Sequence, residues 1–157
     1  MRTEQLAAQV LACLREQGKM LCTAESCTGG LLGKLLTDVP GSSAAYLGGV
    51  VSYTNEVKMR LLGVSADTLR VYTAVSRQCA HEMAKGARER TGADAGVSVT
   101  GLAGPDGDGT GRPVGLVYIA LDLPGFSYCR ELHLTGGRAQ IREQAAREVF
   151  SMLLEYL

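Results

Sequence analysis

A serine and a cysteine stand side by side in the segment Ala24-Glu25-Ser26-Cys27-Thr28-Gly29-Gly30, near the start of the chain. The apolar run from Met20 to Ala24 is typical of a buried strand, and we expect Thr28 to cap a helix that follows. Ser26 would then lie at an electropositive helix N-terminus, which suits an anionic group or a developing oxyanion. An ordinary turn between a strand and a helix has the same pattern, so this segment alone leaves both interpretations open.

A serine hydroxyl is a poor nucleophile until a neighbouring base takes its proton. Lys58 is the candidate base, provided that desolvation or nearby positive charge keeps its amino group neutral. Tyr53 precedes Lys58 at the expected end of a second strand, where its phenol can relay a proton or donate to a carbonyl oxygen. The histidines, His81 and His133, lie outside these motifs, which disfavours a Ser-His-Asp triad.

Cys27 is the rival nucleophile, because a thiol at a helix N-terminus has a lowered pKa. We favour the alternative that Cys27 is a small apolar filler beside Ser26. Glu25 can orient Lys58 or a substrate, although the helix dipole favours a carboxylate at this position in any case.

A glycine-rich loop, Thr100 to Gly111, follows a third apolar run. So long a loop is usually functional or mobile, and the backbone amides at Thr100-Gly101 can cradle a phosphate. The N–H groups from Cys27 to Gly30 are the natural oxyanion donors. Arg138 and Arg142 are four residues apart at the start of the last helix, so they share a face and can add contacts to phosphate.

Hydrophobic spacing and turn residues predict the elements that must position these side chains. Helices are predicted over residues 6–17, 31–39, 56–62, 66–70, 77–90 and 138–156, and strands over 20–24, 44–53, 95–99, 114–121 and 128–134. Ser76 should cap the fifth helix, and residues 123–126 should form an open connection between the last two strands. Helices separate the early strands while the last two pair directly, which predicts a mixed sheet with helices on both faces.

The composition is that of a compact cytoplasmic protein. The chain has 157 residues, 46% of them hydrophobic, and its formal net charge is zero, which favours neither nucleic acid nor a membrane surface as a partner. The five cysteines include no C-x-x-C pair and are typical of reduced thiols, and the histidines are too dispersed for a metal site. The start of the chain contains no long apolar run, so we expect no signal peptide, no membrane span and a cytoplasmic location.

The segments 24–30, 53–58 and 100–107, together with Pro113-Val114-Gly115, resemble the CinA C-terminal domain family in order and spacing. The resemblance runs from Thr23 to the final helix, and it implies a single domain over residues 1–157, without the separate N-terminal domain of some members. It also implies a three-layer α/β/α sandwich with a mixed, mostly parallel central sheet. The implied activity is hydrolysis of nicotinamide mononucleotide to nicotinic acid mononucleotide and ammonia in pyridine nucleotide salvage, without a metal or another cofactor.

The resemblance also assigns roles to residues of this chain. It implies that Ser26, Tyr53 and Lys58 are catalytic, and the pocket should bind a small nucleotide rather than nucleic acid. The expected substrate-binding residues are Glu25, Thr28, Gly29, Gly30, Asn55, Thr100, Gly101, Gly104, Arg138 and Arg142.

The chain departs from the family pattern at Gly136-Gly137-Arg138, where relatives usually have Gly-Asp-Arg. The missing carboxylate leaves the role of Arg138 open. An alternative function is therefore a noncatalytic nucleotide-binding or regulatory module, and a third is an amidase for a different carboxamide nucleotide. A homodimer is compatible with the sequence but is not indicated by it.

Overall fold

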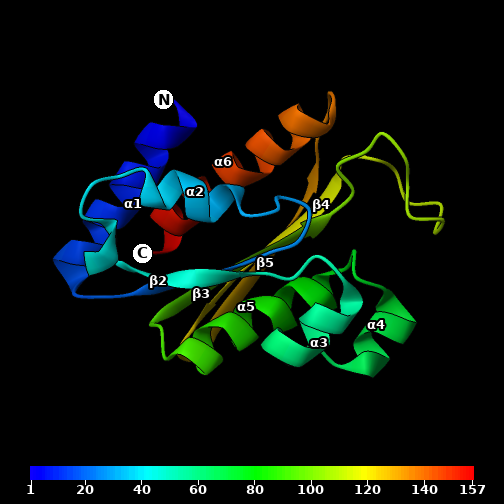
Figure 1. Ribbon diagram of the computed structural model, residues 1–157, viewed down its shortest axis with the longest axis horizontal. Helices are drawn as coiled ribbons and strands as arrows, with labels where there is room; N and C mark the ends of the chain where they lie inside the picture. The colour runs from blue at the N-terminus through cyan, green and yellow to red at the C-terminus, as the bar shows by residue number, and fades with distance from the viewer.

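The computed structural model describes all 157 residues, which form a three-layer α/β fold (Figure 1). Helices separate the first three strands, and the last three strands follow one another directly. The elements in order are α1 Thr3–Gln17, β1 Leu21–Glu25, α2 Leu31–Thr37, the 3₁₀ helix η1 Ser42–Ala44, β2 Tyr46–Val51, α3 Asn55–Leu62, α4 Ala66–Tyr72, α5 Arg77–Thr91, β3 Ala95–Gly101, β4 Leu116–Leu123, β5 Phe126–His133 and α6 Arg138–Tyr156.

The five strands form one mixed sheet in the order β2-β1-β3-β4-β5. β1 pairs in parallel with β2 and β3, whereas β3 with β4 and β4 with β5 pair antiparallel. Helices α1, α2 and α6 cover one face of the sheet, and α3, α4 and α5 lie on the other (Figure 1). This confirms the sandwich and the mixed sheet. None of the helices combines the length and the apolar character that crossing a membrane requires.

The core has one part on each side of the sheet, and alternation along β1 divides its side chains between them. Leu21 joins the larger cluster, which includes Leu11 of α1 and Phe150 of α6. Cys22 joins the smaller cluster with Met83 of α5. Helices with an apolar face on both sides thus fix the sheet in place, and with it the strand ends that carry the polar motifs.

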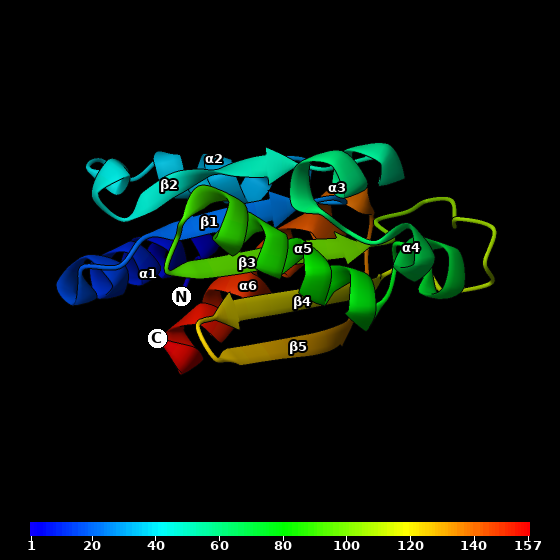
Figure 2. The ribbon, with the colours of Figure 1, turned by 90° about the horizontal axis from the view of Figure 1, so that it is seen from below.

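The carboxyl ends of β1, β2 and β3 meet at one edge of the sheet, beside α3 and the long loop that follows β3 (Figure 2). Glu25 at the end of β1 is in register with Val51 and with Val99. Two further backbone bonds extend the pairing past β1. Ser26 N–H donates to the Val99 carbonyl at 2.9 Å, and Ser52 N–H donates to the Glu25 carbonyl at 2.7 Å.

Two local expectations differ from the structure. The connection between β4 and β5 is not open: Leu123 pairs directly with Phe126, and Pro124-Gly125 forms a two-residue turn. Gly125 has φ +74°, a left-handed conformation that glycine adopts without strain, so the hairpin closes tightly. The strand expected over 44–53 is shorter at both ends, because a 3₁₀ helix precedes it and Thr54 caps the helix that follows it.

Candidate active site

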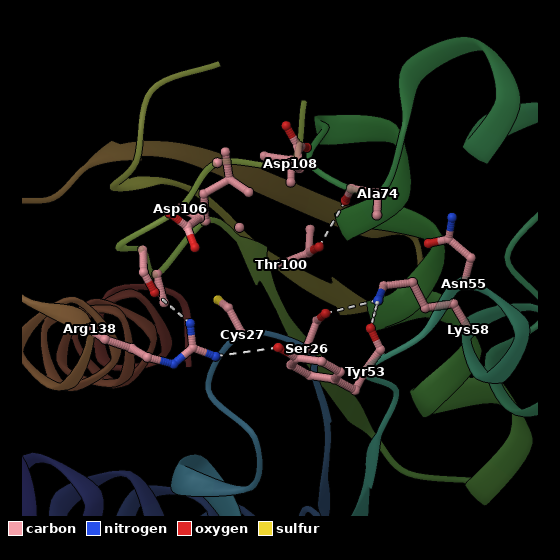
Figure 3. Close-up of a pocket in the computed structure, with 16 residues that line it drawn as sticks. Ser26, Cys27, Tyr53, Asn55, Lys58, Ala74, Thr100, Asp106, Asp108 and Arg138 are labelled. Atoms are coloured by element: carbon pink, nitrogen blue, oxygen red, sulfur yellow. Dashed lines mark hydrogen bonds between the residues drawn. The ribbon is translucent and has the colours of Figure 1, made fainter. Parts of the chain in front are cut away.

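A pocket of about 300 Å³ lies at the shared carboxyl edge of β1, β2 and β3 (Figure 3). This is where open α/β sheets bind ligands, because the connecting loops diverge there. It is lined by Ser26, Cys27, Tyr53, Asn55, Lys58, Ala74, Val75, Thr100, Gly101, Leu102, Ala103, Gly104, Asp106, Gly107, Asp108 and Arg138.

Ser26 and Lys58 form a hydrogen-bonded pair inside this pocket. The Lys58 Nζ lies 2.8 Å from the Ser26 Oγ, and only 1% of Lys58 and 7% of Ser26 is exposed. Two neighbouring carbonyls complete the surroundings of the amine: those of Ser52 at 2.7 Å and Tyr53 at 3.2 Å. A buried amino group is therefore held against a buried hydroxyl.

The first turn of α3 explains how Lys58 reaches this position. Thr54 caps the helix by accepting a hydrogen bond from Val57 N–H at 3.3 Å. Side chains of a helix tilt toward its N-terminus, so the long Lys58 side chain points back along α3 to the end of β2. There the Lys58 amine reaches the carbonyls of Ser52 and Tyr53, two residues that follow the end of β2.

Burial lowers the pKa of Lys58, because the charged ammonium loses its hydration. Its nearest charge partners are the thiols of Cys27 and Cys79, and burial raises the pKa of each to about 12, so both are uncharged at neutral pH. A neutral amine has two N–H groups and one lone pair. When the carbonyls of Ser52 and Tyr53 take the two N–H groups, the lone pair faces the Ser26 hydroxyl, as a general base requires.

Cys27 lines the same pocket but does not have the lowered pKa that the sequence suggested. The residue is 6% exposed. Burial raises the pKa of its thiol to about 12, and the electrostatic effects of Lys58 and Arg142 offset only part of that rise. The thiol therefore stays protonated at neutral pH, as expected of a small apolar filler and not of an activated nucleophile.

Tyr53 and Arg138 meet at the side of the pocket opposite Lys58 (Figure 3). Tyr53 is 60% exposed, and its hydroxyl accepts a hydrogen bond from Arg138 Nη2 at 3.3 Å. Arg138 also donates from Nη1 to the Gly104 carbonyl at 2.6 Å. The phenol thus contacts the guanidinium and makes no hydrogen bond to Ser26 or Lys58 in this state.

The loop after β3 supplies another wall. Thr100, Gly101 and Gly104 line the pocket as expected, but the Thr100 hydroxyl is already occupied, because it donates to the Ala74 carbonyl at 2.8 Å. That bond holds the segment between α4 and α5 against β3. Thr100 therefore shapes the pocket, and its hydroxyl contributes no free donor.

Asp106 and Asp108 also line the pocket and were missed in the sequence reasoning. Aspartates in a glycine-rich loop are typical turn residues, and Asp108 accepts a hydrogen bond from Thr110 N–H at 3.0 Å. The signal that would have found them is the pair of carboxylates in a loop that follows a buried strand. They bring negative charge to the segment expected to cradle phosphate.

Several predicted binding residues lie behind the pocket instead of lining it. Thr28 does not cap α2: Gly30 is the capping residue, and the Thr28 hydroxyl is buried without a partner. The capping group is the Glu25 carboxylate, which strand alternation places on the α2 side of the sheet. It accepts hydrogen bonds from the N–H groups of Gly30 at 3.2 Å, Leu32 at 2.9 Å and Gly33 at 3.1 Å.

Arg142 also lies outside the pocket lining, although it shares a helix face with Arg138. Its Nη2 donates to the Thr28 carbonyl at 2.7 Å. Gly29 lies against the same guanidinium. Arg138 thus faces the pocket, whereas Arg142 contacts the turn that carries Ser26. Asn55, by contrast, lines the pocket as expected.

Nothing in the structure offers a metal site: no group of three or more His, Cys, Asp or Glu side chains is close enough to hold an ion. The fold and the pocket together define a class of three-layer α/β protein, with a buried serine–lysine pair at the carboxyl edge of its parallel strands. The chain belongs to the CinA C-terminal domain family, whose model matches residues 3–157.

Relatives with known sequences support this membership. The chain is 48% identical over 152 residues to a CinA-like protein of Syntrophomonas wolfei, a match that covers 97% of this chain and 36% of that protein. It is 46% identical over 156 residues to a CinA-like protein of Myxococcus xanthus, with coverage of 99% and 37%. The chain therefore spans little more than a third of the length of these relatives.

Solved structures agree in fold over nearly the whole chain. The competence/damage inducible protein CihA of Agrobacterium tumefaciens has a TM-score of 0.94 and 42% identity, covering 98% of this chain and 94% of that one. The competence damage-inducible protein A of Klebsiella pneumoniae has a TM-score of 0.97 and 36% identity, with coverage of 99% and 97%. The names of these proteins refer to competence and to induction by damage, and they state no reaction.

Proposed function

We propose that this protein is a metal-independent amidohydrolase that converts nicotinamide mononucleotide to nicotinic acid mononucleotide and ammonia, in pyridine nucleotide salvage. One observation carries the proposal: the amine of Lys58 is buried, has no carboxylate partner, and lies 2.8 Å from the Ser26 hydroxyl. A lysine with a lowered pKa next to a serine is the arrangement that activates a hydroxyl without histidine.

The first half-reaction is acyl transfer to Ser26. As the Ser26 Oγ attacks the carboxamide carbon, Lys58 Nζ takes the hydroxyl proton and the carbonyl electron pair moves onto oxygen. When the oxyanion collapses, the bond between carbon and nitrogen breaks. The proton on Lys58 passes to the departing nitrogen, which leaves as ammonia, and the acyl group stays on Ser26.

Water completes the second half-reaction at the same amine. Lys58 takes a proton from water as its oxygen attacks the acyl carbon, and the bond to Ser26 Oγ then breaks. Lys58 returns that proton to Ser26, so the free enzyme is regenerated, and the carboxylic acid product loses its remaining proton to solvent to become a carboxylate. Tyr53 can act in proton transfer only after its hydroxyl leaves Arg138, because the two are hydrogen-bonded in the free protein.

The groups around the pair fit a zwitterionic nucleotide. Arg138 uses its hydrogen bonds on neutral acceptors and has no carboxylate partner, so its charge is available to a phosphate. The ring of Tyr53 and the carboxylates of Asp106 and Asp108 suit a positively charged pyridinium ring. Both kinds of charge are present in nicotinamide mononucleotide.

A noncatalytic nucleotide-binding module is the second candidate, and the glycine loop and Arg138 would serve it equally well. Burial of Lys58 argues against it. Phosphate binding needs an exposed, charged lysine, whereas here the amine is desolvated and directed at a hydroxyl. Burying an amine without a carboxylate partner costs folding free energy, and a role in catalysis accounts for its presence better than phosphate binding does.

Ammonia release from nicotinamide mononucleotide, by metal-free protein in the presence of a chelator, tests the proposal. The parent protein and Cys27→Ala should release ammonia, whereas Ser26→Ala should release none above background. No ammonia from a folded parent would refute the amidase. Loss of activity in Cys27→Ala alone would move the nucleophile to the thiol.

A further inference from the structure

The turn that follows Ser26 leaves two backbone N–H groups without a carbonyl acceptor. Gly29 N–H donates to the Ser26 carbonyl at 3.1 Å and closes the turn. The N–H groups of Cys27 and Thr28, between these two residues, donate to no backbone carbonyl, and the Cys27 N–H is near enough to its own thiol to lower the pKa of that thiol. Ser26 and Cys27 both line the pocket, so the Cys27 N–H is the donor next to the nucleophile.

A guanidinium from a distant helix supports this turn from behind. Arg142 of α6 donates from Nη2 to the Thr28 carbonyl at 2.7 Å, across 114 residues of sequence. Gly29 has φ +60°, and a Cβ built there would lie 2.8 Å from Arg142 Nη2. The guanidinium therefore packs directly against the turn at Gly29.

Arg142 has a buried hydrogen-bond donor that no acceptor satisfies. Its Nε is buried without a partner, and the adjacent Thr28 hydroxyl is buried without one as well. No carboxylate balances the charge, since the bond to the Thr28 carbonyl is the one hydrogen bond that Arg142 makes. Arg142 is partly buried, and an apolar side chain of similar length would avoid leaving its Nε buried without a partner, so folding stability alone does not explain the arginine.

The charge of Arg142 is felt inside the pocket. It opposes the rise in the pKa of Cys27 that burial causes, so the guanidinium favours negative charge beside Ser26. A new negative charge arises there when a carbonyl oxygen of an acyl group becomes an oxyanion at this turn.

We infer that Arg142 is a positioning residue for acyl transfer: through the Thr28 carbonyl it fixes the 26–29 turn so that the free Cys27 N–H receives the oxyanion. The inference rests on the amide hydrolysis proposed above and adds a residue that touches no substrate. It also separates the two arginines of α6. Arg138 faces the substrate, and Arg142 faces the peptide that stabilises the transition state.

Steady-state kinetics with nicotinamide mononucleotide test the inference through Arg142→Met and Arg142→Lys. Arg142→Met should lower kcat about 100-fold and leave KM nearly unchanged, because the lost interaction belongs to the transition state. Arg142→Lys keeps the charge and should lose at most about tenfold. The melting temperature of Arg142→Met should equal or exceed that of the parent. Glu143→Gln, an exposed neighbour on α6, is the matched control.

A second readout does not depend on the natural substrate. An alkyl fluorophosphonate forms a bond from phosphorus to the Ser26 oxygen with loss of fluoride, and intact-mass measurement gives the rate of labelling. Arg142→Met should label about 10- to 100-fold more slowly than the parent, because the phosphoryl oxygen uses the same donors. Ser26→Ala should not be labelled.

The outcomes separate this inference from the proposed function. Labelling of Arg142→Met at the parental rate, or equal loss of kcat in Arg142→Lys and Arg142→Met, would overturn the positioning role. A parent that is labelled at Ser26 but releases no ammonia from nicotinamide mononucleotide overturns the proposed substrate alone, and the labelling rates still decide the role of Arg142. A folded parent that is not labelled overturns both.

Discussion

The carboxylate of Glu25 accepts a hydrogen bond from the backbone N–H of Leu32 at 2.9 Å, across the whole turn that contains Ser26. The last residue of β1 thereby caps the helix that follows the turn. The two ends of the turn are thus tied to one side chain, while Arg142 contacts its interior through the Thr28 carbonyl.

Glu25→Gln should weaken these hydrogen bonds. The backbone N–H groups now donate to two carboxylate oxygens, and an amide replaces one of those oxygens with an N–H₂ group that cannot accept. We expect the free energy of unfolding to fall by about 1–3 kcal/mol, as for a buried charge-assisted cap. Urea unfolding followed by circular dichroism measures it. Gln5→Ala, at an exposed cap of α1, provides the comparison, and a Glu25→Gln variant no less stable than that control would contradict the capping role.

Lys58→Met should abolish amidase activity without harming the fold. The folded-state pKa of Lys58 lies below its ordinary value of 10.5 because of burial. At a pH between the folded-state pKa and 10.5, Lys58 is protonated in the unfolded chain and neutral in the folded chain. The contribution of Lys58 to the free energy of unfolding therefore rises with pH through this window and is lowest below it. Met carries no charge, so the variant should be at least as stable as the parent at neutral pH.

The same pKa predicts the pH profile of the parent. kcat/KM should increase with pH through a single ionisation below 10.5, as the Lys58 amine loses its proton. Initial rates across a pH series measure it, with thermal unfolding run alongside to exclude denaturation. A rate that stays constant from neutral to alkaline pH would argue that Lys58 is not the base.

Arg138→Met should mainly raise KM. The guanidinium contacts Gly104 and Tyr53 and faces the pocket, so its loss removes a charge-assisted contact to phosphate of about 1.5–3 kcal/mol, which is roughly 10- to 100-fold in KM. A test with nicotinamide riboside, which has no phosphate, supplies the control. The substitution should change kcat/KM for the riboside much less, and equal losses on the two compounds would place phosphate elsewhere.

Gly137→Asp introduces an acidic residue at the N-cap of α6, and it should stabilise that helix. Gly137 caps the helix with φ −77°, and the Gln140 side chain already accepts its N–H at 2.7 Å. An aspartate would complete the reciprocal capping pair and favour the helix dipole, adding about 0.5 kcal/mol. Differential scanning calorimetry of Gly137→Asp and Gly137→Ala separates the carboxylate from the added Cβ; identical melting temperatures would refute the capping gain.

Gly86→Ala should damage both stability and activity. A Cβ at Gly86 of α5 would lie 1.9 Å from the carbonyl oxygen of Leu62, the last residue of α3. The helices must separate, at a cost of about 1–3 kcal/mol or more, and α3 carries Lys58. Chemical denaturation and the ammonia assay measure the two losses. Gly137→Ala has no atom nearer than 3.8 Å and should show neither.

Local patterns predicted the fold well, since helical spacing and strand alternation survive without tertiary information. Ser26 and Lys58 were predictable as partners, because the carboxyl ends of parallel strands meet at the same edge of a sheet. Ser26 follows the first strand, and Lys58 lies in the first turn of the helix that follows the second strand. The cap of α2 was not predictable. A sequence pattern shows that Thr28 precedes a helix. It does not show that strand alternation turns Glu25 to the same face, where its carboxylate already accepts hydrogen bonds from the first N–H groups of that helix.

Cys27 and Arg142 show what a local pattern leaves out. The place of Cys27 before a helix suggested a lowered pKa for the rival nucleophile, whereas burial raises that pKa, in keeping with the apolar filler that we favoured. Arg142 was assigned to phosphate from its spacing to Arg138. One helical turn moves a side chain along the axis, and here that is enough to place it behind the turn instead of in the pocket.

Ser26 N–H is bonded to β3 and Lys58 to carbonyls that follow β2, so the reacting pair is anchored to the sheet. The loop from 102 to 113, which forms the far wall, contains none of the groups that move protons. Sequence change in that loop can therefore alter which amide enters while the hydrolytic step stays intact. A collection of loop variants on this scaffold would be a source of new amide specificities.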